Sequence, residues 1–317
     1  MAAIRRRHFR RDACGRATRM ALAEASRLTQ PLPGGRQGAT VRVHPINTGY
    51  VLSPAEFMAR TGSSWKAWRS LRSPKEGWLK VPVPAFLIEH PGVGKILVDT
   101  GLHASVAVDP KQNMGWLIGR LYSFEMKPEQ GAAAQLRARG VEASEINVVV
   151  MTHLHMDHAS AISDFTEATY VLGEGEWAAF NARRATFNGY VRRQAAHAVD
   201  YREVVYDTRL ASSYSTFGRS FDLFGDGSLR LVYTPGHSAG HQSLIVRLKD
   251  REALLAGDAI YFIDALEHQR RGHFLHDEHN WRRSLREIQL YRRENPDALI
   301  IPSHDHELWA GLDETYE

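Results

Sequence analysis

The stretch that decides the fold of this 317-residue chain is Val148-Val149-Val150-Met151-Thr152-His153-Leu154-His155-Met156-Asp157-His158. A β-branched apolar run, typical of a buried strand, leads directly into a cluster of metal-binding side chains. In extended backbone alternate residues point to one side, so His153, His155 and Asp157 face the same way. A turn is needed to bring His158 beside them. Four ligands so close together predict two metal ions rather than one.

The chemistry of these side chains narrows the choice of metal. Imidazole combined with carboxylate suits Zn²⁺ or Fe²⁺ better than Mg²⁺ or Ca²⁺, which prefer oxygen ligands. Affinity order does not choose among zinc, iron, cobalt and manganese. Cys14 is the only cysteine, so a metal site in the body of the chain must use nitrogen and oxygen ligands.

Three more candidate ligands follow later apolar runs. His237 comes after TyrThrProGly, Asp258 after LeuLeuAlaGly and His304 after IleIleProSer. Sheets of α/β proteins present functional groups at the ends of their strands. We therefore expect these three side chains to complete the site. Asp99, in AspThrGly, either braces the metal loop from outside or simply forms a turn.

The order His-x-His-x-Asp-His, distant His, Asp and final His resembles the pattern of the metallo-β-lactamase fold superfamily, over roughly residues 41–310. Within that superfamily the chain looks most like the N-acyl homoserine lactone hydrolases. Residues 82–91 and 95–101 are similar to their opening hairpin. Asp258-Ala259-Ile260-Tyr261 matches their Asp-x-x-Tyr element, and Ser303-His304-Asp305 resembles their terminal His-Asp.

This resemblance implies an αββα sandwich, with two mixed β-sheets flanked by helices, and two divalent transition metals per chain, zinc first among them. Seven ligands with one shared carboxylate would give each metal four protein ligands and leave a position for water, as catalytic sites require. The resemblance assigns metal one to His153, His155 and His237, metal two to Asp157, His158 and His304, and the bridging position to Asp258.

The resemblance also implies an activity, opening of the lactone ring of N-acyl homoserine lactones, known as quorum quenching. Metal binding lowers the pKa of water from ~15.7 to about 7, which supplies a nucleophile at neutral pH. Our hypothesis is that a hydroxide bridging the metals attacks the lactone carbonyl while the Tyr261 phenol hydrogen-bonds the carbonyl oxygen. Asp157 would then carry the proton to the leaving alkoxide. Met156, which lies between two ligands, and Tyr261 are predicted to contact the substrate.

Other functions remain open at this point. A second metallohydrolase activity, that of a glyoxalase II-like thioesterase or of an organophosphate hydrolase, would use the same ligands. Tyr261 is also explained by aromatic packing at a strand end. A binding protein that has lost its metals is a third possibility, which the intact ligand set argues against. Eleven further histidines, His241 among them, are expected to lie at the surface or outside the ligand shell.

The charge distribution divides the chain. Residues 1–30 carry eight Arg against Asp12 and Glu24, a net charge of +6 within a total of +4, so the remainder carries −2. A nucleic-acid-binding domain would carry its basic excess on the fold, so we expect no nucleic-acid partner. We interpret residues 1–38, which end in a Pro/Gly-rich stretch, as a basic disordered extension, and residues 39–317 as a single hydrolase domain.

The remaining expectations concern location and secondary structure. No run approaches the ~18 apolar residues that cross a bilayer, so we expect no stable membrane insertion. We also expect a cytoplasmic location and a small-molecule substrate. Whether the chain forms a homodimer is left open. Residues 50–78 and 103–127 show no clean period and predict loops and short helices. Strands are predicted at 41–46, 85–90, 95–99, 146–151, 229–233, 243–248, 253–257 and 298–302, and helices at 129–140 and near 279–294.

Overall fold

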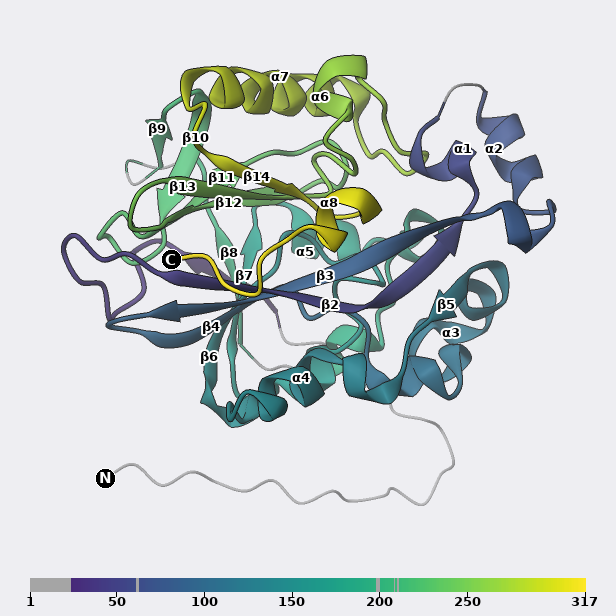
Figure 1. Cartoon of the computed structure of the whole chain (residues 1–317), viewed down its shortest axis with the longest axis horizontal. Helices are drawn as coiled ribbons and strands as arrows, with labels where there is room; N and C mark the ends of the chain where they lie inside the picture. Colours follow the sequence, from purple (N-terminus) through teal and green to yellow (C-terminus); the bar gives the residue numbers. More distant parts are fainter. Residues whose placement is uncertain (1–23, 61–62, 198–199, 208, 210) are drawn as a thin grey trace.

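Two β-sheets stack face to face, and helices cover both outer surfaces (Figure 1). The computed structural model describes residues 24–60, 63–197, 200–207, 209 and 211–317. The two sheets are mixed, with both parallel and antiparallel neighbours. The αββα sandwich expected from the sequence is confirmed.

The larger sheet has eight strands among the described residues, in the order β1-β8-β7-β6-β4-β3-β2-β5. The strands from β4 through β6, β7 and β8 to β1 run parallel, and β2, β3 and β5 complete the sheet with antiparallel pairs. Their bounds are β1 Ser26–Leu28, β2 Arg42–Ser53, β3 Leu79–His90, β4 Gly94–Val98, β5 Ser123–Glu125, β6 Ile146–Val150, β7 Thr169–Gly173 and β8 Asp200–Val204.

The smaller sheet has six strands in the described part of the chain, in the order β14-β13-β12-β11-β10-β9. All neighbours are antiparallel except β13 and β14, which are parallel and connected through a helix. The bounds are β9 Ser212–Tyr214, β10 Phe217–Asp222, β11 Leu229–Tyr233, β12 Gln242–Arg247, β13 Glu252–Gly257 and β14 Leu299–Pro302.

The helices pack on the outer faces of the sheets: α4 and α5 on the larger sheet, α6 and α7 on the smaller (Figure 1). The longest, α7, begins at Asp277, whose carboxylate accepts a hydrogen bond from the Asn280 N–H at 3.0 Å. The α-helices are α1 Ala55–Met58, α2 Ser64–Ser70, α3 Pro110–Leu121, α4 Ala132–Ala138, α5 Glu176–Phe180, α6 Ala265–His268, α7 Glu278–Glu294 and α8 His306–Ala310; the 3₁₀ helices are η1 Lys75–Gly77, η2 Ala104–Ala107, η3 Pro128–Gln130, η4 Ala143–Glu145, η5 Ile162–Asp164, η6 Ala185–Asn188 and η7 Gln194–Ala196.

Side-chain alternation along the strands divides the apolar residues into layers. On β4, Ile96 and Val98 point into the core between the sheets, while Leu97 points outward to the helix layer. On β13, Leu255 joins the central core and Leu254 packs under α7. Because central strands are covered on both faces, they read in the sequence as continuous apolar runs.

The expectation of a disordered extension through residue 38 is wrong for its second half. Residues 26–28 form β1 and pair in parallel with β8. Leu28 and Leu32 are buried in the central core, and the Leu32 N–H donates to the Leu223 carbonyl at 2.8 Å. Two isolated leucines among polar residues give no strand alternation, so the sequence pattern did not predict a strand in this segment. Residues 1–23 of the predicted extension lie outside the described residues.

The other predicted elements form close to their expected positions, and several more were missed. The hairpin β3–β4, the strands β6 and β11 to β14, and the helices α4 and α7 are confirmed. Tyr50–Ser53, expected in a loop, belongs to β2. Within 103–127, where loops and short helices were expected, α3 consists of two short helical segments that meet at Gly115, whose φ is 80°; the strand β5 in this range was not expected. Strands β8 to β10 were not predicted because they are short and interrupted by polar residues. Strand β7 was missed although its Tyr-Val-Leu run has the composition of a buried strand.

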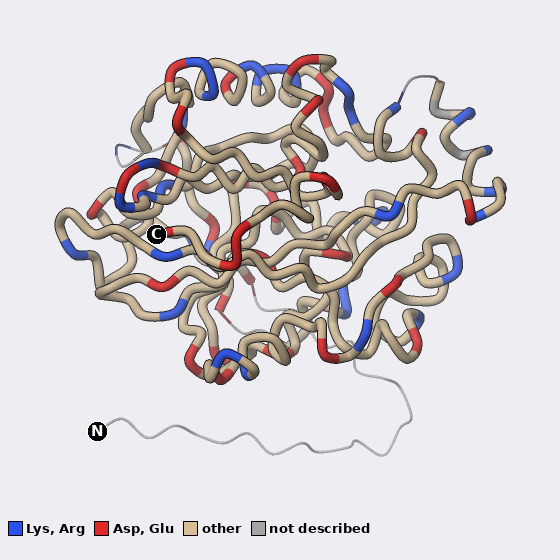
Figure 2. The backbone as a smooth tube through the Cα atoms, in the orientation of Figure 1, with Lys and Arg blue, Asp and Glu red and all other residues tan. Residues whose placement is uncertain are grey.

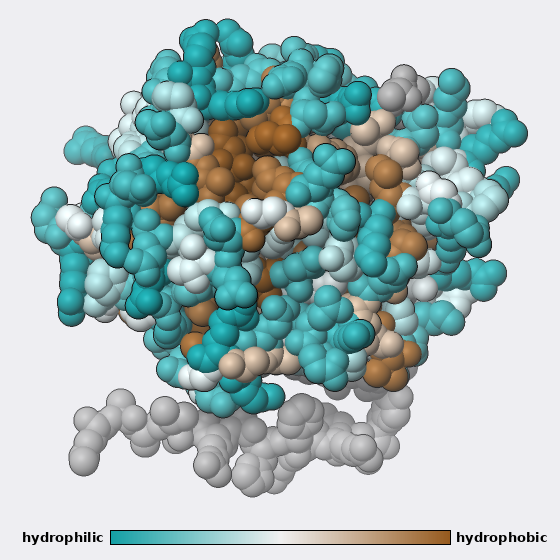
Figure 3. All heavy atoms as spheres, viewed as in Figure 1, coloured by the Kyte–Doolittle hydropathy of each residue, from teal (hydrophilic) through white to brown (hydrophobic). Residues whose placement is uncertain are grey.

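The surface matches the charge arithmetic. Lys and Arg are interspersed with Asp and Glu along the described backbone, as on α7 (Figure 2). The face shown in Figure 3 is mostly hydrophilic, with apolar side chains gathered below α7. Among the described residues, none of the helices is both long and apolar enough to span a bilayer.

Replacing Leu231 tests the packing between the sheets. Leu231 is fully buried in the central core, and truncating a core leucine removes apolar contacts and leaves a cavity. We expect Leu231→Ala to lower the free energy of unfolding by about 2–5 kcal/mol, measured by urea denaturation of metal-free protein. Leu79→Ala, at a position 39% exposed, is the control, and equal losses in the two variants would contradict this account of the core.

Candidate metal centre

Four loops meet at one end of the sandwich and carry all seven predicted ligands. The loop after β6 comes from the larger sheet, whereas those after β11, β13 and β14 come from the smaller. The centre therefore spans both sheets. Two groups have candidate ligand atoms that lie within 4.8 Å of one another: the first group is His153, His155 and His237, and the second group is Asp157, His158 and His304. A third set, His153, His158 and Asp258, meets the same distance limit and links the two groups.

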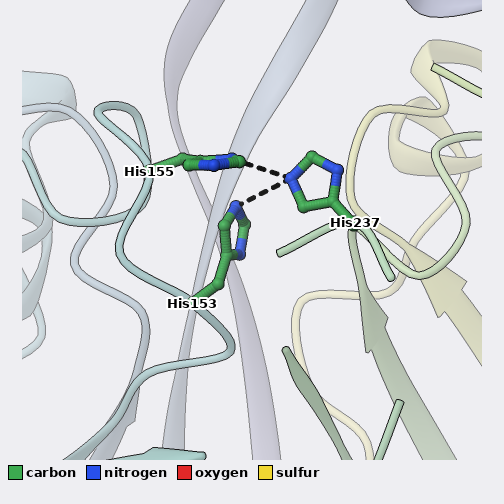
Figure 4. Close-up of side chains that lie close together, drawn as sticks. All are labelled: His153, His155 and His237. Atoms are coloured by element: carbon green, nitrogen blue, oxygen red, sulfur yellow. Dashed lines mark hydrogen bonds between the residues drawn. The ribbon is translucent and has the colours of Figure 1, made fainter. Parts of the chain in front are cut away.

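The first group consists of three imidazoles whose nitrogens converge (Figure 4). His237 Nε2 lies 3.2 Å from His153 Nε2 and 2.8 Å from His155 Nδ1. Ligand nitrogens at ~2.0–2.1 Å from a tetrahedral metal lie about 3.3 Å apart. The nitrogens point at one another, as ligands of a common cation do.

The second group combines a carboxylate with two imidazoles. Asp157 Oδ2 lies 3.7 Å from His304 Nε2 and 3.9 Å from His158 Nε2. The turn expected before His158 is present, since the His158 N–H donates to the His155 carbonyl at 3.1 Å. His158 Nε2 is buried and has no hydrogen-bond partner among the described residues. Such a nitrogen, aimed at two carboxylates, fits a metal ligand.

Asp258 stands between the two groups and offers one oxygen to each. Its Oδ2 lies 3.2 Å from His237 Nε2 and 3.7 Å from His153 Nε2. Its Oδ1 lies 3.2 Å from His158 Nε2 and 3.4 Å from His304 Nε2. This division is the placement that a bridging carboxylate requires.

Hydrogen bonds on the far side of the rings fix their orientation. His158 Nδ1 lies 2.7 Å from Asp99 Oδ2, and His304 Nδ1 donates to the Pro82 carbonyl at 2.9 Å. Each bond places the ring proton on Nδ1 and leaves Nε2 facing the centre. Asp99 also accepts hydrogen bonds from the backbone N–H of Thr152 at 2.7 Å and from the Thr152 hydroxyl at 2.8 Å. Asp99 therefore braces the ligand loop, which was one of the two interpretations of AspThrGly.

His241 is wholly buried beside the centre but is not placed as a ligand. Its Nε2 accepts the backbone N–H of Asp258 at 2.9 Å, and Nδ1 contacts the Thr234 hydroxyl at 2.9 Å. Both ring nitrogens are thus occupied, and burial lowers the pKa of His241 to about 3. A neutral His241 therefore supports the backbone from which the Asp258 carboxylate projects.

Two buried contacts were not anticipated from the sequence. Ser303 Oγ lies 2.5 Å from Asp258 Oδ1. Glu176, at the start of α5, accepts the Leu154 N–H at 2.8 Å. Ser303 is adjacent to a predicted ligand, which offered a signal. Glu176 carried none, because a glutamate opening a short helix is ordinarily a solvated residue.

Burial and charge divide the histidines into two kinds. Burial lowers the pKa of His153 and His237 well below the ordinary value, and that of His155 to about 4, which keeps these rings in the neutral form that binds metal. Burial also lowers the pKa of His158 and His304, but the carboxylates around them together outweigh it and raise the pKa of both: Asp258 and Asp157 act on each ring, and Asp99 acts on His158 as well. The second group is therefore the one that attracts protons.

An apolar cavity opens beside the centre. Asp157, Met156 and Tyr261 line it together with ligands of both groups. The Tyr261 hydroxyl lies 3.4 Å from His237 Nδ1, and burial raises the pKa of its phenol well above the usual range, so it keeps its proton. A Cβ at Gly272 would lie 2.3 Å from the Tyr261 ring, so only glycine allows this close packing.

Comparison with known proteins agrees with this architecture. The family model described as the metallo-beta-lactamase superfamily matches residues 78–304. N-acyl homoserine lactonase AttM of Rhizobium radiobacter is 34% identical over 235 residues, which cover 74% of this chain and 85% of the relative. Matched with AiiA of Bacillus thuringiensis, solved with N-decanoyl-L-homoserine at its active site, the fold gives a TM-score of 0.68 at 21% identity, covering 89% of this chain and 98% of AiiA.

A third similar protein is AidC, whose structure is described as a dizinc quorum-quenching lactonase in complex with a product. It gives a TM-score of 0.57 at 14% identity and covers 87% of this chain and 90% of AidC. The chain belongs to the metallo-beta-lactamase superfamily. Its relatives within that superfamily include N-acyl homoserine lactonases, which confirms the resemblance found in the sequence.

The pKa difference between the two groups predicts how metal loading depends on pH. Ligands must lose their protons to bind a metal, and the raised pKa values of His158 and His304 mean that these two rings hold a proton to higher pH than the other imidazoles of the centre. Falling pH should therefore weaken one of two Zn²⁺ sites more steeply than the other. Chelator competition between pH 6 and 8, with calorimetry in buffers of different ionisation enthalpy, measures this. Equal pH slopes for both sites would refute it.

Proposed function

We propose that this protein is a dimetal hydrolase that opens the lactone ring of N-acyl homoserine lactones. The observation that carries the proposal is the junction of the seven-residue ligand cluster with an apolar cavity that has Tyr261 at its border. The AttM relatives support the substrate class, because 85% of the length of such a lactonase is matched. Hydrolysis of this kind inactivates a quorum-sensing signal.

The nitrogen and carboxylate ligands suit two divalent transition metals. We propose that His153, His155 and His237 hold one, that Asp157, His158 and His304 hold the other, and that Asp258 bridges. Zinc is our first choice, with iron, cobalt and manganese as alternatives; the dizinc neighbour AidC supports this order. When bound, such metals supply hydroxide at neutral pH and polarise a carbonyl group.

The side chains around the ligands have distinct roles in this proposal. Tyr261 keeps its phenolic proton and donates a hydrogen bond to the oxygen of the lactone carbonyl as negative charge develops there. The Asp157 side chain is 14% exposed, against 4% for Asp258, and it lines the cavity. Asp157 is therefore the carboxylate that can receive a proton and deliver it to the leaving alkoxide.

The cavity accounts for the acyl chain. Met156 forms part of the wall next to the ligands, as the sequence analysis proposed, and its flexible thioether adapts to the chain. Away from the ligands the walls are almost entirely apolar, which favours a fatty acyl group over a charged one. These walls include Val51, Phe57, Met58, Val81, Leu117, Ile118, Leu121, Tyr122, Phe187 and Phe274.

A cytoplasmic location completes the proposal, and the homodimer stays an open alternative to the monomer. Cell fractionation tests the first, and light scattering coupled to gel filtration tests the second. Neither affects the chemistry derived above, because all seven ligands come from one chain.

The proposed activity is tested by ring opening of N-decanoyl homoserine lactone, followed by proton release. We expect turnover by metal-loaded protein that a chelator abolishes, and Asp258→Asn should lose at least one metal and most of the activity because it no longer offers a charged oxygen to each group. Metal-loaded protein with two bound ions and no lactone turnover would refute the substrate assignment. Thioesters and phosphotriesters would then be assayed.

Replacing Tyr261 tests its role separately from metal binding. Tyr261→Phe keeps the ring and the packing against Gly272 but removes the hydrogen-bond donor, so we expect kcat/KM to fall on the order of 10²-fold. Metal content should not change. Tyr50→Phe is the control, because Tyr50 is a β2 tyrosine that does not line the cavity. An unchanged kcat/KM for Tyr261→Phe would remove the phenol from the scheme.

A further inference from the structure

A buried carboxylate outside the ligand set connects two of the ligand loops. Glu176 opens α5 and is fully buried. Its Oε1 accepts the Leu154 N–H at 2.8 Å, and its Oε2 accepts the Ser238 hydroxyl at 2.7 Å and the Gly240 N–H at 2.9 Å. Glu176 does not line the apolar cavity, so it has no route to the substrate.

The partners of Glu176 are neighbours of one group of proposed ligands. Leu154 lies between His153 and His155, and Ser238 directly follows His237. His153 and His155 lie on the loop after β6 in the larger sheet, and His237 lies on the loop after β11 in the smaller sheet. One carboxylate therefore connects, across the two sheets, the loops that present all three imidazoles of the first group.

Backbone packing around α5 supports the same connection. A Cβ at Gly240 would lie 2.4 Å from the Glu176 nitrogen, and a Cβ at Gly173 would lie 2.0 Å from the Gly240 carbonyl oxygen. Neither position has room for a side chain. Glycine at both positions lets the loop before β12 approach the start of α5 closely enough for Glu176 to reach it.

We propose that Glu176 is a positioning residue that sets the separation between the His153–His155 pair and His237, and thereby the affinity of this group for its metal. These three partners are hydrogen-bond donors, and the Tyr190 hydroxyl also hydrogen-bonds the carboxyl, so the site matches a charged carboxylate with two accepting oxygens. A glutamine would present an NH₂ group to at least one of these donors. The inference rests on the proposed metal-binding role of the three histidines and not on the choice of lactone as substrate.

Glu203 on β8 provides a matched control. Its Oε1 accepts the Trp177 N–H at 3.0 Å, so it contacts the start of the same helix. Burial raises the pKa of both carboxyls, which makes the cost of burying the charge similar in kind. The described contacts of Glu203 include none with a loop that carries a proposed ligand. Glu203→Gln therefore perturbs the helix without releasing the ligand loops.

The experiment compares Zn²⁺ binding by full-length wild type, Glu176→Gln and Glu203→Gln in competition with a chromophoric chelator. Removing such outer partners of metal ligands typically costs 10–100-fold in affinity, so Glu176→Gln should weaken one of two Zn²⁺ sites by at least about 10-fold and leave the other unchanged. Glu203→Gln should bind both ions as wild type does. Thermal unfolding with and without Zn²⁺ separates positioning from stability: Glu176→Gln should reduce the rise in Tm that Zn²⁺ produces, and Glu203→Gln should not.

Three results overturn the proposal: wild-type affinity at both sites in Glu176→Gln, equal weakening at both sites, or the same loss in Glu203→Gln. If Glu176→Gln does not fold, Ser238→Ala removes the hydrogen bond from the loop that carries His237 to Glu176 Oε2 and leaves the carboxylate in place. It should weaken the same site several-fold, and unchanged binding would overturn the proposal. Wild-type protein that binds no metal would instead refute the assignment of the ligands.

Discussion

The end of the sandwich that carries the site depends on one buried negative charge, that of Asp258, being balanced by the imidazoles around it. Asp258 is only 5% exposed, and four imidazole nitrogens lie within 3.7 Å of its oxygens. Removing a charge from water costs several kcal/mol, which only close partners of opposite charge and hydrogen bonds recover. The partners come from both sheets, since His153 and His158 follow β6 while His237 and His304 follow strands of the other sheet. The charge on Asp258 is thus stabilised only when the two sheets are packed together so that all four imidazoles reach it.

The same carboxylate makes the two groups of ligands unlike each other. Around His153, His155 and His237 burial dominates and the rings are neutral. Around His158, three carboxylates, those of Asp258, Asp99 and Asp157, favour the cationic ring. A cation in the second group replaces protons, whereas a cation in the first group meets ligands that are already deprotonated. Two sites built from similar side chains therefore differ in the work required to load them.

Which features of the fold and the site could be predicted from the sequence depends on how far apart in the sequence the interacting residues lie. The ligands were readable because each follows an apolar strand within a few residues, and strand ends gather at one edge. The strands β8 to β10 and the short β1 were not readable, because tertiary packing rather than periodicity holds them in place. Asp99 was flagged because it ends a predicted strand. Glu176 was not, since its partners on the ligand loops are 22 to 64 positions away in the sequence.

Some of the residues that line the cavity lie on segments other than those that carry the candidate ligands. The ligands stand on loops of the two sheets, which the superfamily model covers from residue 78 to 304. The cavity wall also uses Phe57 and Met58 of α1, before that range, and Leu117 of the interrupted helix α3. Short helices of this kind contribute little to the central cores, so they can change without disturbing the ligands. In the proposed function, membership of the superfamily accounts for the reacting groups, whereas α1, α3 and the segment around Phe187 would decide which acyl chain fits.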